Sequence, residues 1–193
     1  MSENQVGKRE IERRWLMKLD DFNTILNYNG NIKYIGVVDT IYFNNTVKKS
    51  LVGIHNELRF RRITYFDTKK ESCKITYKEG SGLNRREEEY DCDPKLFDLL
   101  CGKYKVMHFI YYKEERVGKE FIFKVVPLSS KFTIVLIENE FGSEEEANAF
   151  QLPEYLHPYD ITEVTNDPKF SNYNLYKRYK LDSCMVTVET RTL

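Results

Sequence analysis

The sequence lacks several features that mark common classes of protein. It has three histidines and four cysteines in 193 residues, and no two cysteines form a C-x-x-C pair, which argues against a zinc cluster. It has no glycine-rich Walker or Rossmann loop, which argues against the familiar nucleotide-binding folds. The longest apolar run, 132–137, contains a threonine and is far too short to span a membrane.

Neither sign of charge is in excess. The chain carries 30 basic and 30 acidic residues, whereas a non-specific binder of nucleic acid or of a membrane surface carries a basic excess. We therefore expect neither a membrane nor double-stranded nucleic acid as a partner. The first residues are polar and lack the apolar region of a signal peptide, so we expect a cytoplasmic protein. The cysteines are then expected to be reduced thiols used as small core residues: Cys73, Cys92, Cys101 and Cys184.

Segments with strand character dominate the chain. They are rich in β-branched and aromatic residues and most alternate apolar with polar residues: 8–17, 33–43, 57–66, 72–79, 85–91, 105–113, 119–126 and 132–141. The chain has no internal repeat and no linker rich in proline, glycine or serine, so we expect one domain over 1–193. About eight strands with few helices predict a mainly β (α+β) fold, antiparallel and closed or nearly closed into a barrel.

Helix signals are fewer. Asp93 is a candidate N-cap, and Pro94 suits the first position of the helix that follows it. Ser143 and Glu146 have the spacing of a capping box, which predicts a second helix start. Shorter helices are expected near 20–26 and 174–180.

Charged residues are sorted along the predicted strands. Because alternate residues of a strand share one face, several strands pair a charged face with a mostly apolar one. Two rows are acidic, two are basic and one is mixed: Glu10/Glu12, Glu138/Glu140, Arg59/Arg61, Lys74/Lys78, and Arg85 with Glu87, Glu89 and Asp91. An ordinary antiparallel sheet with one solvated face would also explain charged rows.

A second explanation follows from the sorting by sign. Like charges two residues apart on a strand repel each other unless a group of opposite charge binds beside them. Paired carboxylates are natural oxygen ligands of Mg²⁺ or Mn²⁺, and paired arginines and lysines suit phosphate oxygens. Acidic rows that face basic rows across a barrel would hold a metal-bound polyphosphate.

The rows occur in motifs that resemble those of the CYTH superfamily, the triphosphate tunnel metalloenzymes. Residues 10–16 (EIERRWL) are similar to the family's glutamate-x-glutamate-x-lysine signature on the first strand, except that Arg14 stands in place of the lysine. The remaining motifs follow in the family's order: LRFR at 58–61, TYK at 76–78, RREEE at 85–89, LIENE at 136–140 and the segment 163–172.

The resemblance implies an eight-stranded antiparallel barrel, over about 8–175, whose charged interior forms a tunnel. It implies a triphosphate-containing small molecule as the ligand and Mg²⁺ or Mn²⁺ as the cofactor. By resemblance, the metal ligands or positioners of the attacking water are Glu10, Glu12, Glu138 and Glu140. The triphosphate ligands are Arg14, Arg59, Arg61, Lys74, Lys78 and Arg85, and the catalytic group is Glu10, Glu12 and Arg14. Further candidate tunnel residues are Glu87, Glu89, His108 and Lys169.

One wall of the expected tunnel departs from the family pattern. The sixth strand of the family carries a basic-x-basic pair, for which the best placement here gives His108 and Ile110. The seventh strand offers acidic residues, where this chain has Ile122 and Lys124 unless Glu120 shifts into register. The substrate could therefore differ from plain inorganic triphosphate, turnover could be weak, or the protein could only bind its ligand.

These observations favour a metal-dependent triphosphatase that hydrolyses the terminal phosphoanhydride of inorganic triphosphate or a nucleoside triphosphate. One alternative is a class IV-type adenylyl cyclase, which converts ATP to cyclic AMP and pyrophosphate, and another is a catalytically idle nucleotide-binding protein. The four glutamates of the two acidic rows favour an enzyme. The 14 tyrosines and 12 phenylalanines leave a homodimer patch or base stacking open, although core packing explains them first.

Overall fold

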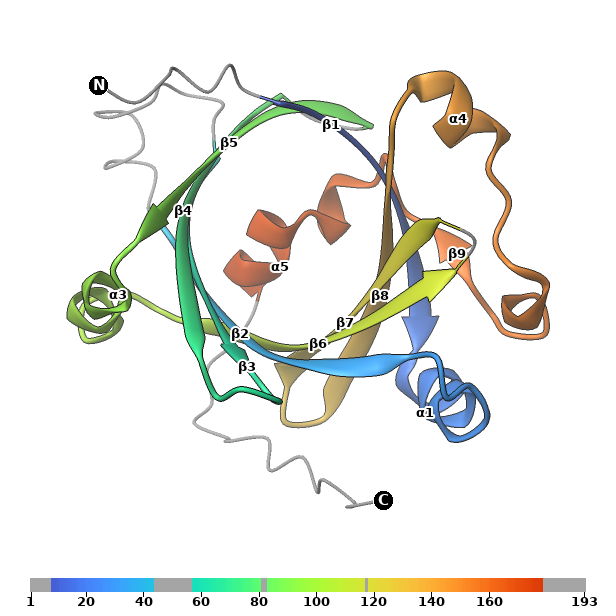
Figure 1. Ribbon diagram of the computed structural model, residues 1–193, viewed down its shortest axis with the longest axis horizontal. Coiled ribbons are helices and arrows are strands. Elements are labelled where there is room, and N and C mark those ends of the chain that lie inside the picture. Colours follow the sequence, from blue (N-terminus) through green and yellow to red (C-terminus); the bar gives the residue numbers. More distant parts are fainter. Residues whose placement is uncertain (1–7, 44–56, 81–82, 117, 179–193) are drawn as a thin grey trace.

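Eight antiparallel strands close into a barrel, as the sequence predicts (Figure 1). The computed structural model describes residues 8–43, 57–80, 83–116 and 118–178. The strands of the barrel are β1 (Lys8–Lys18), β2 (Lys33–Tyr42), β3 (Glu57–Tyr65), β4 (Glu71–Glu79), β5 (Asn84–Cys92), β6 (Met107–Arg116), β7 (Lys119–Ser129) and β8 (Phe132–Phe141). Their bounds lie within a few residues of those expected from the alternation of apolar and polar side chains.

Strand β1 closes the barrel because it pairs with two strands that lie far from it in the chain. It pairs with β8 over 11–18 and with β5 over 8–11. The sequence did not predict β9 (Thr162–Glu163), which pairs with Trp15 and Leu16 on the edge of β1 that β5 leaves open. The C-terminal segment therefore enters the seam of the barrel.

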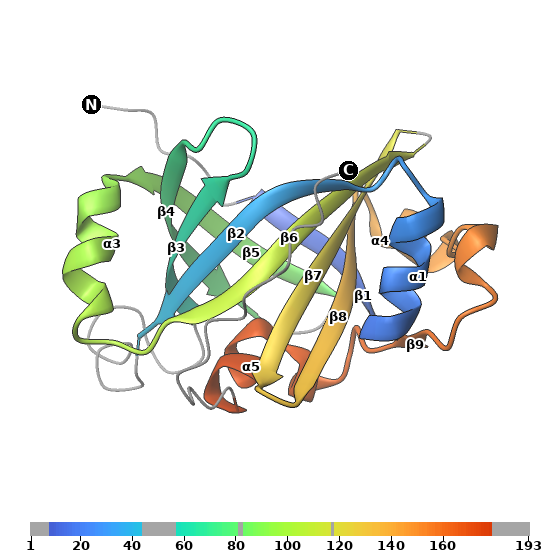
Figure 2. The ribbon, with the colours of Figure 1, turned by 90° about the horizontal axis from the view of Figure 1, so that it is seen from below.

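Short helices flank the outer wall of the barrel and cover one of its ends (Figures 1 and 2). They are α1 (Leu19–Tyr28), α3 (Pro94–Cys101), α4 (Glu144–Ala149) and α5 (Asn172–Arg178), with 3₁₀ turns η1 (Glu154–Leu156) and η2 (Pro168–Phe170). Both predicted caps are confirmed, because Asp93 accepts a hydrogen bond from the Lys95 amide and Ser143 accepts one from the Glu146 amide. The last two residues of the helix expected near 174–180 lie outside the described residues.

The apolar core has two parts outside the barrel and one inside it. Outside, Phe22 and Phe123 belong to the cluster that α1, α4 and η1 cover, and Phe97 of α3 packs on Ile41 and Cys73 at another part of the wall. Inside, Leu175 of α5 is fully buried in a cluster formed mainly by β2, β6, β7 and β8. Figures 1 and 2 together show α1 and α3 on the outer wall and α5 across one end of the barrel.

The cysteines are free thiols where the structure describes them. Cys73 and Cys92 lie opposite each other on β4 and β5 with their Sγ atoms 2.7 Å apart, and Cys101, the last residue of α3, packs against the same cluster. Cys184 lies outside the described residues. No helix of the described part of the chain is long and apolar enough to span a membrane.

An ion-paired cluster fastens α3 to the outer wall. The buried Asp39 of β2 receives hydrogen bonds from His108 Nδ1 at 2.5 Å and from Arg62 Nη2 at 2.9 Å. Arg62 also donates to Asp98 of α3 at 2.8 Å. Burial alone would raise the pKa of Asp39, but the hydrogen bonds from His108 and Arg62 outweigh it and hold that pKa below its ordinary value.

We expect Asp39→Asn to lower the free energy of unfolding at pH 7 by about 1–3 kcal/mol, because His108 and Arg62 lose their ion pair with the buried carboxylate. A carboxylate with a depressed pKa in the folded state stabilises the protein above its unfolded-state pKa, and this contribution disappears as the pH falls through its folded-state pKa. Urea unfolding at pH 7 and at about pH 3 should therefore show a difference at pH 7 that shrinks in acid. The control is Asp160→Asn, which removes an exposed ion pair with Lys18. Equal losses in the two variants would contradict this role of Asp39.

Candidate active site

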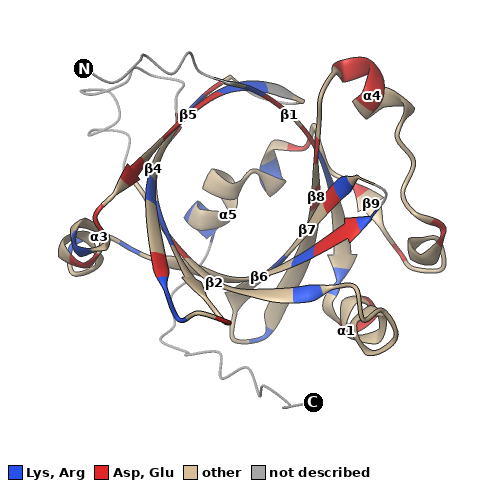
Figure 3. Ribbon diagram, in the orientation of Figure 1, with Lys and Arg blue, Asp and Glu red and all other residues tan. Residues whose placement is uncertain are grey.

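Charged residues of both signs lie on neighbouring strands of the barrel wall (Figure 3). Directly paired residues lie on the same side of a sheet, and the register pairs Glu10 with Arg85 and Arg14 with Glu138. The same face continues across β5, β4 and β3 through the pairs Glu87/Lys78, Glu89/Thr76, Asp91/Lys74, Thr76/Arg59 and Lys74/Arg61. The predicted acidic and basic rows are therefore brought together inside the barrel.

Two buried carboxylates of β1 are held by cations of three strands. Glu12 accepts from Arg14 Nε at 2.5 Å and from Arg85 Nη2 at 2.9 Å. Both oxygens of Glu10 lie within 2.8 Å of Lys78 Nζ, and Arg85 lies 3.3 Å from one of them. The carboxylates thus hold in place the cations that would otherwise repel one another.

The two carboxylates have opposite pKa shifts. Burial raises the pKa of Glu10, and its ion pair with Lys78 only partly offsets the effect. At Glu12 burial also favours the neutral form, but the charges of Arg14 and Arg85 outweigh it and hold the pKa well below its ordinary value. Glu12 is therefore a permanent anion of the barrel interior at neutral pH.

Glu138 of β8 completes the acidic group. Its Oε1 lies 3.2 Å from Arg14 Nε, and its Oε2 forms an ion pair with Lys124. Glu140, two residues further on, pairs in register with Glu12 and is exposed at the rim of the barrel.

A second group of charges lies on β3, β4 and β5. Arg61 and Lys74 contact Glu89 at 2.9 and 3.0 Å, and Arg59 lies 3.4 Å from Glu87. Burial first, and the adjacent charge of Arg59 second, lower the pKa of Arg61. A cation disfavoured in this way would gain from an anionic ligand.

Several guanidinium groups have buried N–H donors without a hydrogen-bond partner in the described structure: Arg14 Nη2, Arg59 Nε, Arg61 Nε and Arg85 Nε. A buried donor left unsatisfied costs about 1–3 kcal/mol, and more when the group is charged. Phosphate oxygens are acceptors that match the planar fork of a guanidinium group. These donors therefore have the chemistry of a polyphosphate site.

A cavity of about 460 Å³ adjoins these charges where the C-terminal segment covers the barrel. The barrel contributes Glu12, Arg14, Glu57, Lys78, Gly80 and Arg85, and the C-terminal segment contributes Thr165, Asn166, Asp167, Pro168, Ser171, Tyr173 and Asn174. The resemblance pointed to segment 163–172 and to Lys169 within it, but it did not identify these lining residues, because their irregular backbone has no periodic signal. The polar lining and its volume suit a compact, highly charged ligand.

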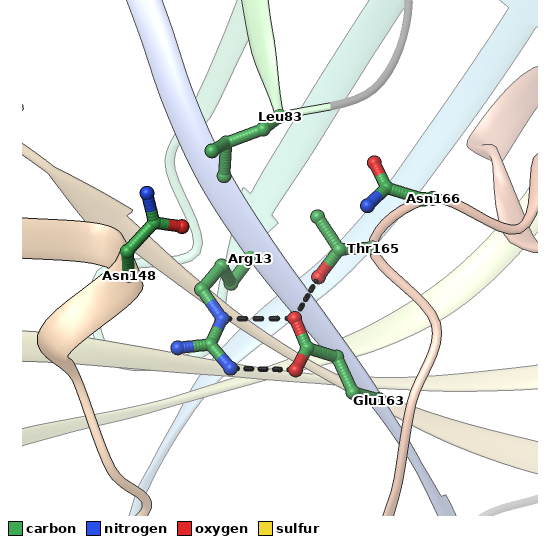
Figure 4. A pocket seen from close by; sticks show the side chains of 6 residues that line it. All are labelled: Arg13, Leu83, Asn148, Glu163, Thr165 and Asn166. Carbon is green, nitrogen blue, oxygen red and sulfur yellow. Dashed lines mark hydrogen bonds and ion pairs between the residues drawn. The ribbon is translucent and has the colours of Figure 1, made fainter. Parts of the chain in front are cut away.

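A smaller pocket near the seam has its charges already satisfied. Figure 4 shows Arg13 facing the Glu163 carboxylate, to which it donates twice at 2.8 and 2.5 Å, while the Thr165 hydroxyl donates to the same carboxylate at 2.7 Å. Arg13 also donates to the carbonyls of Ala147 and Phe150 at the end of α4. These contacts of Arg13 fasten α4 and β9 to β1, and they use four of its five N–H donors.

The donor set on β1 and β8 fits a hard divalent cation. Glu12, Glu138 and Glu140 lie on adjoining positions of one inner face, and the buried Glu138 Oε1 has no hydrogen-bond donor. Carboxylate oxygens are ligands that Mg²⁺ and Mn²⁺ prefer, and Mg²⁺ commonly takes its other ligands from water and substrate phosphates. Among the described residues no three His, Cys, Asp or Glu side chains are already gathered as a metal centre, because cations hold these carboxylates.

The expected placement of the sixth strand is wrong. Residue Tyr111 pairs with Lys124, whose ammonium group reaches Glu138 inside the barrel, so Tyr111 and Lys113 point inward. His108 lies on the outer face, where it binds Asp39, and Ile110 packs in the outer core.

The remaining departures from the family pattern lie on β7, and Lys169 is the last candidate to be placed. Ile122 and Lys124 do lie on the inner face, and Glu120 shares it and forms an ion pair with Lys113. Lys169 is exposed on η2 and does not line the 460 Å³ cavity.

No family model matches the chain, and no curated protein matches it in sequence. Solved structures do match it. The protein HpAC1 from Hippeastrum, described as an adenylyl cyclase candidate with a dominant triphosphatase activity, superposes with a TM-score of 0.65 at 15% identity, over 89% of this chain and 97% of its own. The inorganic triphosphatase NE1496 superposes with a TM-score of 0.53 at 23% identity, over 86% of this chain and 93% of its own. The chain has a CYTH-like fold.

The inner face of the CYTH-like barrel can be tested by comparing the stability of the protein with and without a ligand. We expect Arg61→Gln to weaken binding of tripolyphosphate at least about tenfold, because a charge-assisted hydrogen bond contributes about 1.5–3 kcal/mol. The unfolding free energy of the ligand-free protein should not fall, since burial and Arg59 already disfavour this charge. Thermal denaturation with and without tripolyphosphate measures both effects.

The matched control is Arg86→Gln, which removes an exposed arginine of β5 that pairs with Glu88. This control should bind tripolyphosphate as the wild type does. If Arg61→Gln also keeps the wild-type affinity, the inner arginines are not the anion site.

Proposed function

We propose that this protein is a metal-dependent triphosphatase that hydrolyses the terminal phosphoanhydride of inorganic triphosphate or of a nucleoside triphosphate. One observation carries the proposal. Buried guanidinium groups with unsatisfied donors adjoin buried carboxylates inside a closed barrel. Phosphoryl transfer depends mainly on positioning and on neutralising charge, and this interior supplies both kinds of group.

The arginines and lysines of the inner face would bind the triphosphate. Arg59, Arg61 and Lys74 form one side of the site, and Arg14, Lys78 and Arg85 adjoin the cavity. The carboxylates that hold these cations keep them oriented before the substrate arrives, so little reorganisation is needed during the reaction.

The acidic side of the site would hold Mg²⁺ or Mn²⁺. Glu12, Glu138 and Glu140 are the ligands we assign, and a bound ion would supply charge neutralisation and a water of lowered pKa. Glu10 gives both oxygens to Lys78, and we therefore assign it a positioning role toward that lysine and Arg85. The closed wall and the C-terminal segment would limit the access of bulk water.

A class IV-type adenylyl cyclase remains the second candidate. It is favoured by the similarity to HpAC1, whose description combines both activities. The cavity beside Tyr173 and Asn174 would then have to hold the base and ribose of ATP. A catalytically idle nucleotide binder is the third candidate, and it would need the arginines but not the three carboxylates of the metal site.

Analysis of the reaction products separates these functions. The purified protein is given tripolyphosphate or ATP with Mg²⁺ or Mn²⁺, and orthophosphate, pyrophosphate and cyclic AMP are quantified. We expect metal-dependent release of orthophosphate. Cyclic AMP with pyrophosphate would replace the proposal by the cyclase, and tight binding of the nucleotide without any product would replace it by the binder.

Glu12→Gln tests the assignment of the site. The amide keeps the size and one acceptor oxygen of the carboxylate but is a poor metal ligand, so we expect metal-dependent turnover to fall about 100-fold or more. Tripolyphosphate should bind as tightly as to the wild type or more tightly, because a negative charge has been removed beside Arg14 and Arg85. Phosphate release, calorimetric titration and circular dichroism check rate, affinity and fold.

The control is Glu88→Gln, whose side chain pairs with Arg86 outside the barrel. Full activity of Glu12→Gln would remove Glu12 from the site.

A further inference from the structure

Lys124 of β7 is a buried cation inside the barrel, and it has no role in the proposed reaction. It pairs in register with Tyr111 of β6 and Leu136 of β8, and its ammonium group forms an ion pair with Glu138 Oε2. The ring of Phe109 lies 5.7 Å from its Nζ atom. Burial, only partly offset by Glu138, lowers the pKa of Lys124.

A buried ion pair at this position is not explained by stability. Removing an ammonium group and a carboxylate from water costs several kcal/mol for each ion, and apolar residues of similar volume often stabilise a protein as well or better. The neighbours on this side are apolar, since Leu136 and Phe109 both belong to the core inside the barrel. The position of the charge therefore calls for a role connected with Glu138.

The charges around Glu138 are already balanced by the protein itself. The buried carboxylates Glu10, Glu12 and Glu138 contact four cations: Arg14, Lys78, Arg85 and Lys124. Lys78 also lies 3.1 Å from Glu87, and with this carboxylate the group carries a net charge of 4 − 4 = 0 before any metal ion binds.

The oxygen atoms of the three carboxylates are also largely taken. Glu10 gives both oxygens to Lys78, and Glu12 gives one to Arg14 and the other to Arg85. Glu138 Oε2 is held by Lys124, and Glu138 Oε1, which lies 3.2 Å from Arg14 Nε, is the one oxygen of these three carboxylates that accepts no hydrogen bond in the described structure. A single cation would bind at this oxygen, beside Glu12 and Glu140 on adjoining positions of the same face, and it would compete with Arg14 and Arg85 for the oxygens of Glu12.

We propose that the Lys124 ammonium group supplies, as a fixed part of the protein, the positive charge that a second divalent ion would bring, so that the barrel binds one Mg²⁺ or Mn²⁺ per chain. Lys124 acts through Glu138 and is a positioning residue. It holds one oxygen of this carboxylate and so directs the other toward the ion. The inference rests on the proposed metal site of Glu12, Glu138 and Glu140 but not on the reaction that follows.

The test counts bound ions and does not use activity. The full chain is titrated with Mn²⁺ alone, and free Mn²⁺ is followed by electron paramagnetic resonance, with calorimetry as a second measure of stoichiometry. We expect one Mn²⁺ per wild-type chain. Lys124→Gln removes a positive charge close to the ion and frees Glu138 Oε2, so its Mn²⁺ affinity should rise at least about tenfold. Lys124→Glu adds a carboxylate to the same wall and should bind two ions.

The matched control is Lys113→Gln. Lys113 lies on the inner face of β6 but pairs with Glu115 and Glu120 instead of Glu138. This variant should keep the stoichiometry and the Mn²⁺ affinity of the wild type.

Two ions or none on the wild-type chain would overturn the proposal whatever the variants do, so it stays testable if a variant does not fold. Unchanged or weaker Mn²⁺ binding by a folded Lys124→Gln variant would also overturn it, and circular dichroism identifies the folded variants. The two proposals can fail separately. If the wild-type chain binds one Mn²⁺ and Lys124→Gln raises the Mn²⁺ affinity, but the protein releases no orthophosphate, the proposed triphosphatase is wrong and this inference stands.

Discussion

The structure depends on the pairing of opposite charges inside a closed barrel. The strands direct these charged side chains toward the barrel interior. Glu12 lies between Arg14 and Arg85, and Lys78 is bound by both oxygens of Glu10. Without these contacts the buried ions would be unstable, because an uncompensated buried charge costs several kcal/mol. The same contacts use one part of each guanidinium group and leave other N–H donors unsatisfied. The interactions that allow the fold therefore also leave donors that an anionic ligand would satisfy.

The interior is divided between this charged arc and an apolar side. β1, β5, β4 and β3 provide most of the charges, whereas β2, β6, β7 and β8 supply apolar residues that α5 covers with Leu175. The C-terminal segment thus lies against the apolar side, and the cavity remains between this segment and the charges. This division would place a compact anion against the cationic strands, and it explains why a charged interior is compatible with a packed core.

Local patterns predicted most of the fold and showed which charges share a strand face, whereas the expectation that these faces line the interior came from the sorting of charges by sign and from the resemblance to the CYTH superfamily. Alternation identified the strands, and Glu10, Glu12 and Arg14 share a face because a strand has a period of two. The inner face of β6 could not be predicted in this way, because its sequence, MHFIYYKEER, has apolar and polar residues on both faces. Only the pairing of Tyr111 with Lys124 decides it. The contact between Lys124 and Glu138 and the lining by 165–174 likewise depend on positions far apart in the chain.

The central claim is that the inner face of the barrel is a polyphosphate site. A crystal structure of the chain soaked or grown with tripolyphosphate and Mn²⁺ tests it most directly. The account predicts a phosphate chain inside the barrel, bound to the inner arginines of β1, β3 and β5, with the metal ion between the phosphate oxygens and the carboxylates of β1 and β8. A phosphate chain bound only on the outer wall, with the inner ion pairs unchanged, would contradict the account.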